Sequence, residues 1–254
     1  MFFNTRKSIM MILIIVIVCL MIPFSFAEDN STDDDLGYTI EFVSDDCYFD
    51  SSVENDTGDG SFDNPYKCLT DDRVRNNTVI HLRDGEYNFT PLKSKNNLTI
   101  HGQNPEKTII KGDGSVLMVD TRFTLDNVTF INTPIMNRGI MNATNCIFKN
   151  ANANAVKNNL SYGGAVYAAS HQHDTYLTNC RFINNSAYCG GAVFINGGLL
   201  QAIGCSFMNN TALGYGGAIA CENQYGSKPR FRIINSIFDG DKSVNNLGGA
   251  IFAQ

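Results

Sequence analysis

The second half of the chain repeats a short hydrophobic pattern that is interrupted by Asn and Gly. Each copy has Asn or Gly, then a small residue, any residue and Phe, and the copies occupy residues 127–130, 145–148, 179–182, 204–207 and 235–238. The spacing between copies varies while the four-residue core does not, so loops absorb the insertions. Such repetition is typical of solenoid proteins, in which each repeat is one supersecondary unit.

A second motif follows the first in most copies and completes the repeat. Gly-Gly-Ala, followed by Val or Ile, recurs at residues 163–166, 190–193, 216–219 and 248–251, with a degenerate version at 138–140. Each repeat then predicts a strand, a bend, a second strand, a polar loop, a Gly-Gly bend and a third short strand. The glycines bend the chain and let successive turns approach closely.

The alternation of apolar residues places the first bend at the Asn. Val128 and Phe130 share one face of a strand. Leu125 is three positions before Val128, so the two-residue period slips by one at Asn127. Gly204 takes the same position in the fourth copy, and Asn and Gly most readily adopt left-handed backbone angles. We therefore predict a tight left-handed bend between two strands.

One repeat cannot bury its apolar face alone, but stacked repeats can. Strand stacking at about 4.8 Å places like residues on like. It predicts one internal column of Phe130, Phe148, Phe182, Phe207 and Phe238, and a second of Val128, Cys146, Cys180, Cys205 and Ser236. We expect the cysteines to be free thiols, with a disulfide between adjacent rungs as the alternative. The predicted fold is an all-β parallel β-helix with outward Asn ladders.

Two sets of motifs resemble known families. The pattern F-x-N-N-x-A followed by Gly-Gly-Ala, in residues 182–193 and 207–219, resembles the polymorphic membrane protein (Pmp) repeat of chlamydial surface adhesins and of adhesin-like proteins of methanogenic archaea. The start of pectin-lyase-like β-helices is similar to residues 58–67, 79–87 and 97–102. The resemblance implies a right-handed parallel β-helix and, for function, surface adhesion.

The sequence predicts four segments. Residues 1–27 have a basic start, a short apolar core and a small-x-small site, which is the pattern of a secretory signal peptide, with an uncleaved anchor as the alternative. Residues 28–55 are expected to form an acidic, partly disordered leader. Residues 56–122 would form the N-terminal cap and first β-helix rungs, and residues 123–254 the Pmp-like repeats, which end in mid-repeat.

Charge and composition limit the classes of molecule that the protein is expected to bind. The formal net charge is −6, and the acids concentrate in residues 28–72. This balance argues against nucleic-acid binding. No apolar run after the signal peptide is long enough to span a membrane. Ten Asn-x-Ser/Thr sequons are potential glycosylation sites in an exported chain.

Candidate catalytic or ligand-binding residues lie in two loops. The loops hold His171, His173 and Asp174, and, two repeats later, Glu222, Lys228 and Arg230. The first group suits a metal or a catalytic role and the second a carbohydrate contact, while a solvated polar loop is the plainer interpretation of both. We predict no catalytic residue, no cofactor-binding residue and no metal-binding residue.

An acidic turn near the N-terminus is a candidate calcium site. It contains Glu54, Asp56, Asp59 and Asp63 around two glycines. The spacing does not match the D-x-D-x-D-G register with a distal Glu, so an acidic turn without metal is favoured.

The favoured function is a non-catalytic, secreted or cell-surface adhesin-like or structural β-helix protein that binds a surface protein or a glycan. The alternative is a polysaccharide-active enzyme, a lyase or glycoside hydrolase, or its degenerate relative. The last rung is expected to be open, so that it either stacks on another chain or reflects truncation.

Overall fold

The computed structural model describes residues 45–155, 161–170, 172–222, 230–245 and 247–254. The predicted signal peptide and most of the predicted leader lie outside the described residues, as do His171 and Lys228. Within the described part, the regular structure is almost entirely β-strand, and the helical content is one 3-10 turn, Ala153–Ala155.

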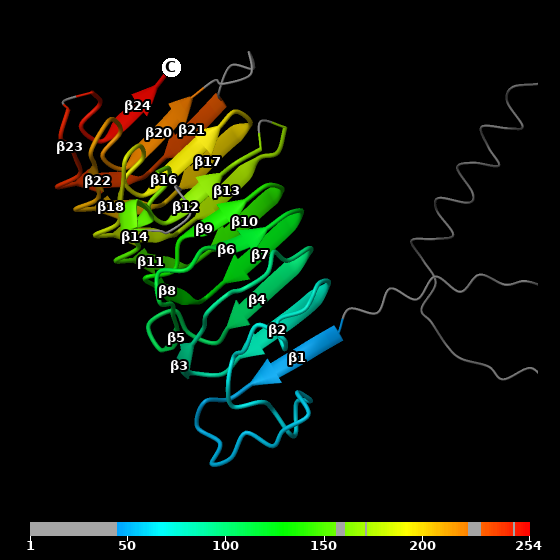
Figure 1. Cartoon of the computed structure of the whole chain (residues 1–254). Helices are drawn as coiled ribbons and strands as arrows, with labels where there is room; N and C mark the ends of the chain where they lie inside the picture. The colour runs from blue at the N-terminus through cyan, green and yellow to red at the C-terminus, as the bar shows by residue number, and fades with distance from the viewer. Residues whose placement is uncertain (1–44, 156–160, 171, 223–229, 246) are drawn as a thin grey trace, which may run out of the picture. The chain divides into compact units, whose positions relative to one another are not determined.

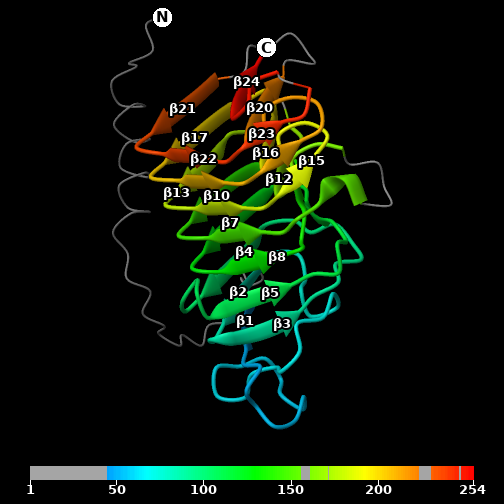
Figure 2. The same ribbon diagram turned by 90° about the vertical axis from the view of Figure 1, so that its left-hand side faces the viewer.

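Three long sheets and one short sheet run along the molecule (Figures 1 and 2). Sheet A contains β1 (Asp45–Phe49), β2 (Thr78–Leu82), β4 (Leu98–Gly102), β7 (Arg122–Asp126), β10 (Ile140–Thr144), β13 (Thr175–Thr178), β17 (Leu199–Ile203) and β21 (Arg230–Ile234). Sheet B contains β3 (Gly85–Asn88), β5 (Thr108–Lys111), β8 (Thr129–Ile131), β11 (Ile147–Lys149), β14 (Arg181–Ile183), β18 (Ser206–Met208) and β22 (Ile237–Asp239). Sheet C contains β6 (Leu117–Val119), β9 (Ile135–Asn137), β12 (Val166–Ala168), β16 (Val193–Asn196), β20 (Ile219–Glu222) and β24 (Ile251–Ala253). Sheet D contains β15 (Ser186–Ala187), β19 (Thr211–Ala212) and β23 (Lys242–Ser243).

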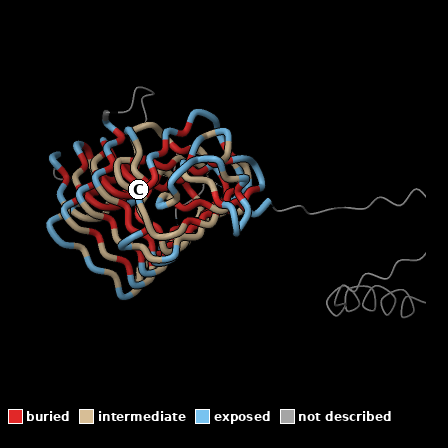
Figure 3. Tube along the Cα trace, turned by 90° about the horizontal axis from the view of Figure 1, so that it is seen from below, coloured by how far each residue is buried: buried red, intermediate tan, exposed pale blue. Residues whose placement is uncertain are grey.

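The chain path makes these sheets the sides of a parallel β-helix. From sheet A the chain enters sheet B, then sheet C, and returns to sheet A one strand further along, so that neighbours in a sheet are one rung apart. Every registered strand pair is parallel. Buried residues fill the interior and exposed residues line the outside (Figure 3). The predicted fold class, an all-β right-handed parallel β-helix, is confirmed.

Left-handed bends join sheet A to sheet B, as predicted. These positions have φ between 48° and 63° and are Asn127, Asn145, Asn179, Gly204 and Asn235. A second row of left-handed residues follows sheet B, where the sequence analysis expects only a polar loop: Asn132, Asn150, Asn184, Asn209 and Gly240. Because Asn tolerates this conformation better than other residues with a Cβ, the Asn-rich composition serves backbone geometry at both corners.

The predicted Phe column lies inside sheet B. Its rings stack from rung to rung, with centroids 5.7, 4.9, 4.8 and 4.8 Å apart in the order Phe130, Phe148, Phe182, Phe207 and Phe238. The Cα register pairs the same residues. Towards the N-terminus, Ile110 and Tyr87 continue the column. This column forms a continuous apolar contact between successive rungs.

The predicted cysteine column is buried and contains free thiols. The Sγ atoms of Cys146, Cys180 and Cys205 each lie 3.3–3.6 Å from backbone carbonyl oxygens, to which the thiols donate weak hydrogen bonds. In sheet C, burial raises the pKa of Cys221 to about 12. Such thiols pack as small apolar groups and are poorly reactive.

The Gly-Gly-Ala motifs bring neighbouring rungs close together. The first glycine of each motif takes a positive φ, as in Gly190 at 62°. The second glycine of the first three motifs packs against backbone: a Cβ on Gly191 would lie 2.1 Å from the carbonyl oxygen of Gly217 and 2.6 Å from the backbone nitrogen of Thr211. Only glycine fits there without moving the adjacent rung.

Two kinds of Asn ladder run along the rod. At the exposed bend, Asn145 donates to Asn127 and Asn179 donates to Asn145, over 3.2 and 3.4 Å. A buried ladder follows the second bend. There the backbone N–H and Nδ2 of Asn185 both donate to Oδ1 of Asn210, each over 3.0 Å. Outward Asn ladders are therefore present, and the Asn-Asn doublets supply an inward one as well.

The first rung begins earlier in the chain than the predicted domain boundary at residue 56. Strand β1 pairs with β2 along its whole length, with Cys47 and Phe49 buried. It lies within residues 28–55, where we expected an acidic leader. The acids Asp45 and Asp46 lie at its start and face outward, so the acidic composition concealed a strand with an alternating buried face.

Candidate functional site on the outer face of sheet A

The structure brings together residues from the two loops that the sequence analysis considered separately. Asp174 precedes β13 and Arg230 begins β21, and their side chains lie 3.6 Å apart between Oδ1 and Nη2. The same carboxylate accepts hydrogen bonds from the backbone of Leu199 and from the hydroxyl of Tyr176, each over 3.0 Å. Asp174 therefore ties neighbouring rungs together.

Of the other four candidate residues in these loops, the structure describes His173 and Glu222. His173 Nδ1 lies 2.7 Å from the hydroxyl of Ser170 within its own loop. Glu222 ends β20 in sheet C. The structure thus shows side chains that fix loop conformation, and among the residues it describes no group of three or more His, Cys, Asp or Glu is placed to hold a metal ion.

The acidic turn is held by an Arg side chain and by backbone amides. Both carboxylate oxygens of Asp56 lie 2.8 Å from Nη1 of Arg73, and the backbone N–H groups of Lys67 and Cys68 donate to Oδ1. Burial acts to raise the pKa of Asp56, but these hydrogen bonds outweigh it and lower the pKa to about 2. A carboxylate engaged in this way holds the cap together, and its Oδ1 atom already accepts from three donors.

A row of aromatic and ionisable side chains lies on the outer face of sheet A, in its first rungs. The Cα register aligns Tyr48, His81, His101 and Asp126 on four successive strands, β1, β2, β4 and β7. The Tyr48 and His81 rings are stacked, with centroids 4.4 Å apart, and the two His rings are 5.4 Å apart. The strands thus hold these side chains in one line.

Each imidazole in this row is oriented by a carboxylate. His81 Nε2 lies 3.2 Å from Oδ1 of Asp46, and His101 Nδ1 contacts Oδ2 of Asp126. Asp126 is held in turn by Asn127, whose Nδ2 donates to its other oxygen over 3.1 Å. Because a carboxylate only accepts, the N–H of each neutral ring faces it, and the opposite ring nitrogen is left as an acceptor.

A small pocket opens beside this row. It has a volume of about 240 Å³, and we call it the N-terminal pocket; it is lined by Tyr48, Phe62, His81, Leu82, Arg83, His101, Gly102 and Gln103. Aromatic walls with a few fixed polar groups are typical of ligand-binding pockets, and the volume suits one small ring and not a larger molecule.

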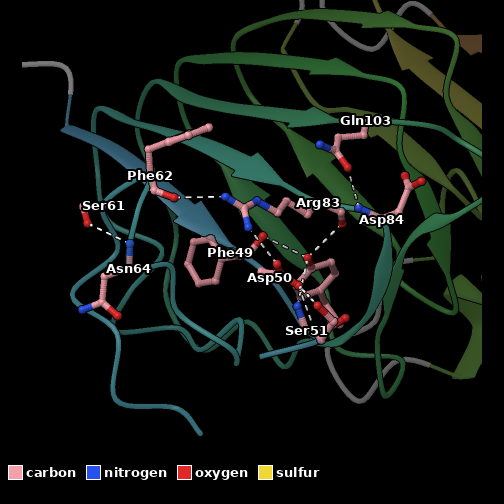
Figure 4. Close-up of polar contacts among 11 residues, drawn as sticks. Phe49, Asp50, Ser51, Ser61, Phe62, Asn64, Arg83, Asp84 and Gln103 are labelled. Carbon is pink, nitrogen blue, oxygen red and sulfur yellow. Dashed lines mark hydrogen bonds and ion pairs between the residues drawn. The ribbon is translucent and has the colours of Figure 1, made fainter. Parts of the chain in front are cut away.

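Arg83 fixes the wall of the pocket (Figure 4). Its guanidinium donates to Asp50 over 2.9 Å and to the backbone oxygen of Phe62 over 3.0 Å, and it lies 5.3 Å from the centroid of the Phe62 ring. Phe62 also meets Tyr48 edge to face, with centroids 5.4 Å apart. Although 62% of Phe62 is exposed, its position is defined by two residues, Arg83 and Tyr48. Across the pocket, Gln103 Oε1 accepts from the backbone of Asp84.

A larger cavity of about 720 Å³ lies between the loops of residues 69–76 and 88–95. Lys95 lies at its edge and is only 4% exposed. Its ammonium lies 2.8 Å from the carboxylate of Asp71 and 3.1 Å from the backbone oxygen of the same residue. This buried ion pair joins two loops of the cap, and removing one partner would leave a buried charge.

The N-terminal pocket was not predicted from the sequence. A signal was present, because Ile80-His81 and Ile100-His101 occupy equivalent places at the ends of two apolar strands. Their alignment depends on the register across a loop of irregular length, which local patterns do not define. Phe62 and Arg83 are brought together by the fold of the cap, and no local sequence motif indicates their contact.

One comparison with known proteins gives a match. The model of the Chlamydia polymorphic membrane protein repeat matches residues 204–222, which run from the bend before β18 to the end of β20. Neither the curated proteins nor the solved structures yield a match. The matched residues include the left-handed Gly204, the stacked Phe207 and a Gly-Gly-Ala motif, so the match covers elements that make one rung. Among the described residues, no helix has the length and apolar character needed to cross a membrane.

Proposed function

We propose that this protein is a non-catalytic, adhesin-like β-helix protein of the cell surface or of the secreted fraction, which attaches to a glycan or a protein on another surface. The observation that carries the proposal is the Pmp repeat match at residues 204–222, since it links a rung of this rod to a family of surface proteins. The signal peptide predicted at residues 1–27 supports export.

The construction of the rod supports attachment. Its core is a continuous stack, so the outer face of sheet A is a flat platform of eight parallel strands. One register column of this face carries hydroxyl and amide groups on successive strands, namely Thr99, Thr124, Asn142, Tyr176 and Gln201. Uncharged polar groups at a regular spacing of about 4.8 Å suit recognition of an extended polar ligand.

One observation favours the second candidate, a polysaccharide-active enzyme. The pairing of Asp126 with His101 is the arrangement that orients an imidazole as a general base. A glycoside hydrolase would in addition need two carboxyl groups facing the same bond. Asp46 and Asp126 lie on β1 and β7, three strand steps apart in sheet A, so at about 4.8 Å per step they are farther apart than the two carboxyl groups of a glycoside hydrolase.

A single screen tests the proposal against this candidate. The chain from residue 28 to residue 254 is presented to immobilised glycans, polysaccharides and surface proteins, and both retention and the release of new sugar ends are measured, with and without calcium. Retention without new ends supports attachment. New reducing or unsaturated ends would establish the enzyme instead, and loss of retention in all conditions would contradict the proposal.

A further inference from the structure

We propose that the N-terminal pocket binds one uncharged pyranose ring of a glycan. The proposal rests on the proposed function, because it supplies the ligand class and the place where attachment begins. It concerns a site in the first rungs, outside the residues matched by the Pmp repeat. Four properties of the site lead to this ligand: its size, its rings, its hydrogen-bonding groups and its charge.

Size and rings favour a sugar ring. A volume of about 240 Å³ is below the usual range for drug-sized ligands, but it accommodates a single six-membered ring that remains attached to a chain outside. A pyranose has an apolar C–H face that packs on aromatic rings. Phe62 offers such a ring, exposed to solvent yet held by Arg83 and Tyr48.

The hydrogen-bonding groups are fixed before any ligand arrives. Asp126 contacts Nδ1 of His101 and Asp46 contacts Nε2 of His81, so in each neutral ring the other nitrogen is left as an acceptor, and both residues line the pocket. Gln103 is anchored through Oε1, which leaves its amide N–H groups as donors. Sugar hydroxyls both donate and accept, and a rigid site with both kinds of group binds them at a small entropic cost.

Charge selects against acidic sugars. The carboxylates of Asp46 and Asp126 lie next to the imidazoles, 53% and 28% exposed. The nearest cation, Arg83, is already paired with Asp50 at 2.9 Å. Arg83 is the only Lys or Arg in the described lining and is already paired, so a uronic acid or another anionic sugar would find no unpaired cation there and would lie near the carboxylates that contact the imidazoles. A neutral hexose or N-acetylhexosamine needs no counter-charge.

The test measures binding of neutral methyl glycosides and of a methyl uronide to the chain from residue 28 to residue 254, by saturation-transfer NMR and by titration of amide resonances. We expect at least one neutral glycoside to bind with a dissociation constant on the order of 1 mM and the uronide to bind more weakly. Resonance shifts should concentrate at Tyr48, Phe62, His81, His101 and Gln103.

Two variants locate the binding. Phe62→Ala should weaken the neutral glycoside at least about tenfold, while Phe231→Ala, which removes another exposed ring, on β21 at the opposite edge of sheet A from β1, should leave it unchanged. Asp126→Asn would place an amide donor beside His101 and move the ring proton to Nε2, turning an acceptor into a donor. It should weaken the neutral sugar, and imidazole nitrogen shifts would report the tautomer.

The outcomes separate this proposal from the proposed function. Tighter binding of the uronide than of every neutral glycoside by the wild type would show an anion site and overturn the inference. Equal affinities for the wild type and Phe62→Ala would also overturn it. If the surface screen still shows retention in either case, attachment stands and is carried by another face. A zinc titration that shifts His81 and His101 while no glycoside binds would show a metal site instead.

Discussion

The first rungs and the repeat rungs follow the same backbone path, but different interactions hold neighbouring rungs together. From β10 onward, identical residues stack, with Phe on Phe, Cys on Cys and Asn on Asn. Among the described residues, most ion pairs lie before residue 139, such as Arg73 with Asp56 and Arg138 with Asp120. The repeat rungs are specified by repetition, and the first rungs by individual pairs that also leave room for a pocket.

This difference predicts where the rod tolerates substitution. A residue in a repeat rung packs against the rung before it and the rung after it. Even a small change of its side chain must therefore fit against both neighbours. A side chain on the outer face of a first rung has neighbours of different kinds and is less constrained. The substitution expected to cost the most stability is therefore one at a close backbone contact between repeat rungs.

Gly191→Ala should have the largest effect. Its new Cβ would lie 2.1 Å from the carbonyl oxygen of Gly217 and 2.6 Å from the backbone nitrogen of Thr211, and backbone cannot move without separating two rungs. We expect a loss of about 5 kcal/mol or more in the free energy of unfolding, measured by urea denaturation, or failure to fold. Gly249→Ala is the control, because its Cβ would meet no described atom within 4 Å. Equal losses of unfolding free energy in the two variants would show that these positions need glycine for its backbone flexibility and not for the close contact between rungs.

Phe182→Ala should have the next largest effect. Phe182 is fully buried between the rings of Phe148 and Phe207, so truncation leaves a cavity inside a close-packed column. We expect a loss of about 3–5 kcal/mol in urea denaturation. Phe62→Ala, which removes the same side chain from the outer face of the first rungs, should change stability by less than about 1 kcal/mol. A similar loss in both variants would contradict the distinction between the two regions.

The repeat rungs were also the part of the molecule that the sequence predicted best. The bend at Asn127, the Phe column and the Gly-Gly contacts follow from local rules that apply again in each copy, so repetition confirmed each interpretation. The second bend after sheet B was missed because Asn-Asn doublets such as Asn184-Asn185 look like polar loop. In fact one Asn takes the left-handed conformation and the next is buried.

The first rungs could be predicted only in part. The cap and rung motifs were found, but strand β1 was concealed by acidic composition, and the N-terminal pocket depends on which residues face one another across loops. The alignment of His81 with His101 requires the register of β2 and β4, and the contact of Arg83 with Phe62 requires the fold of the cap. Neither is encoded by a local pattern.

Asp241→Asn should stabilise the repeat rungs. Asp241 occupies the position of Asn185 and Asn210 in the buried ladder, and its Oδ1 accepts from Asn210. The Nδ2 atoms of Asn185 and Asn210 donate to backbone carbonyls, whereas Oδ2 of Asp241 is buried and has no partner within the described part of the chain. An amide would restore a donor, so we expect a gain of about 1 kcal/mol at neutral pH in urea denaturation.

The gain from Asp241→Asn should depend on pH. Burial raises the pKa of Asp241 above its usual value, with a contribution from the charge of Asp239. A raised folded-state pKa means that the folded protein holds the proton more tightly, so this group favours folding in acid and loses that contribution as the pH rises through the folded pKa. The advantage of the Asn variant should therefore shrink as the pH falls through the raised folded-state pKa of Asp241, and it should reach its minimum by about pH 4, the ordinary pKa of Asp. Asp239→Asn is the control for removing one charge from the same rung.

Asp56→Asn should have the smallest effect, and its pH dependence should have the opposite sign. The carboxylate of Asp56 pairs with Arg73 at the surface of the cap, so removing its charge should cost only about 1 kcal/mol at neutral pH. Its pKa of about 2 lies below the ordinary value of 3.8, so the folded state favours the ionised form. That contribution is present above pH 3.8 and is lost as the pH falls towards 2. Wild type and variant should converge in urea denaturation series over this interval, with Asp63→Asn, a change on the same turn, as the control. A cap variant whose penalty persisted down to pH 2 would show that Asp56 acts through packing, and the contrast between a charge-paired cap and a stacked repeat would fail.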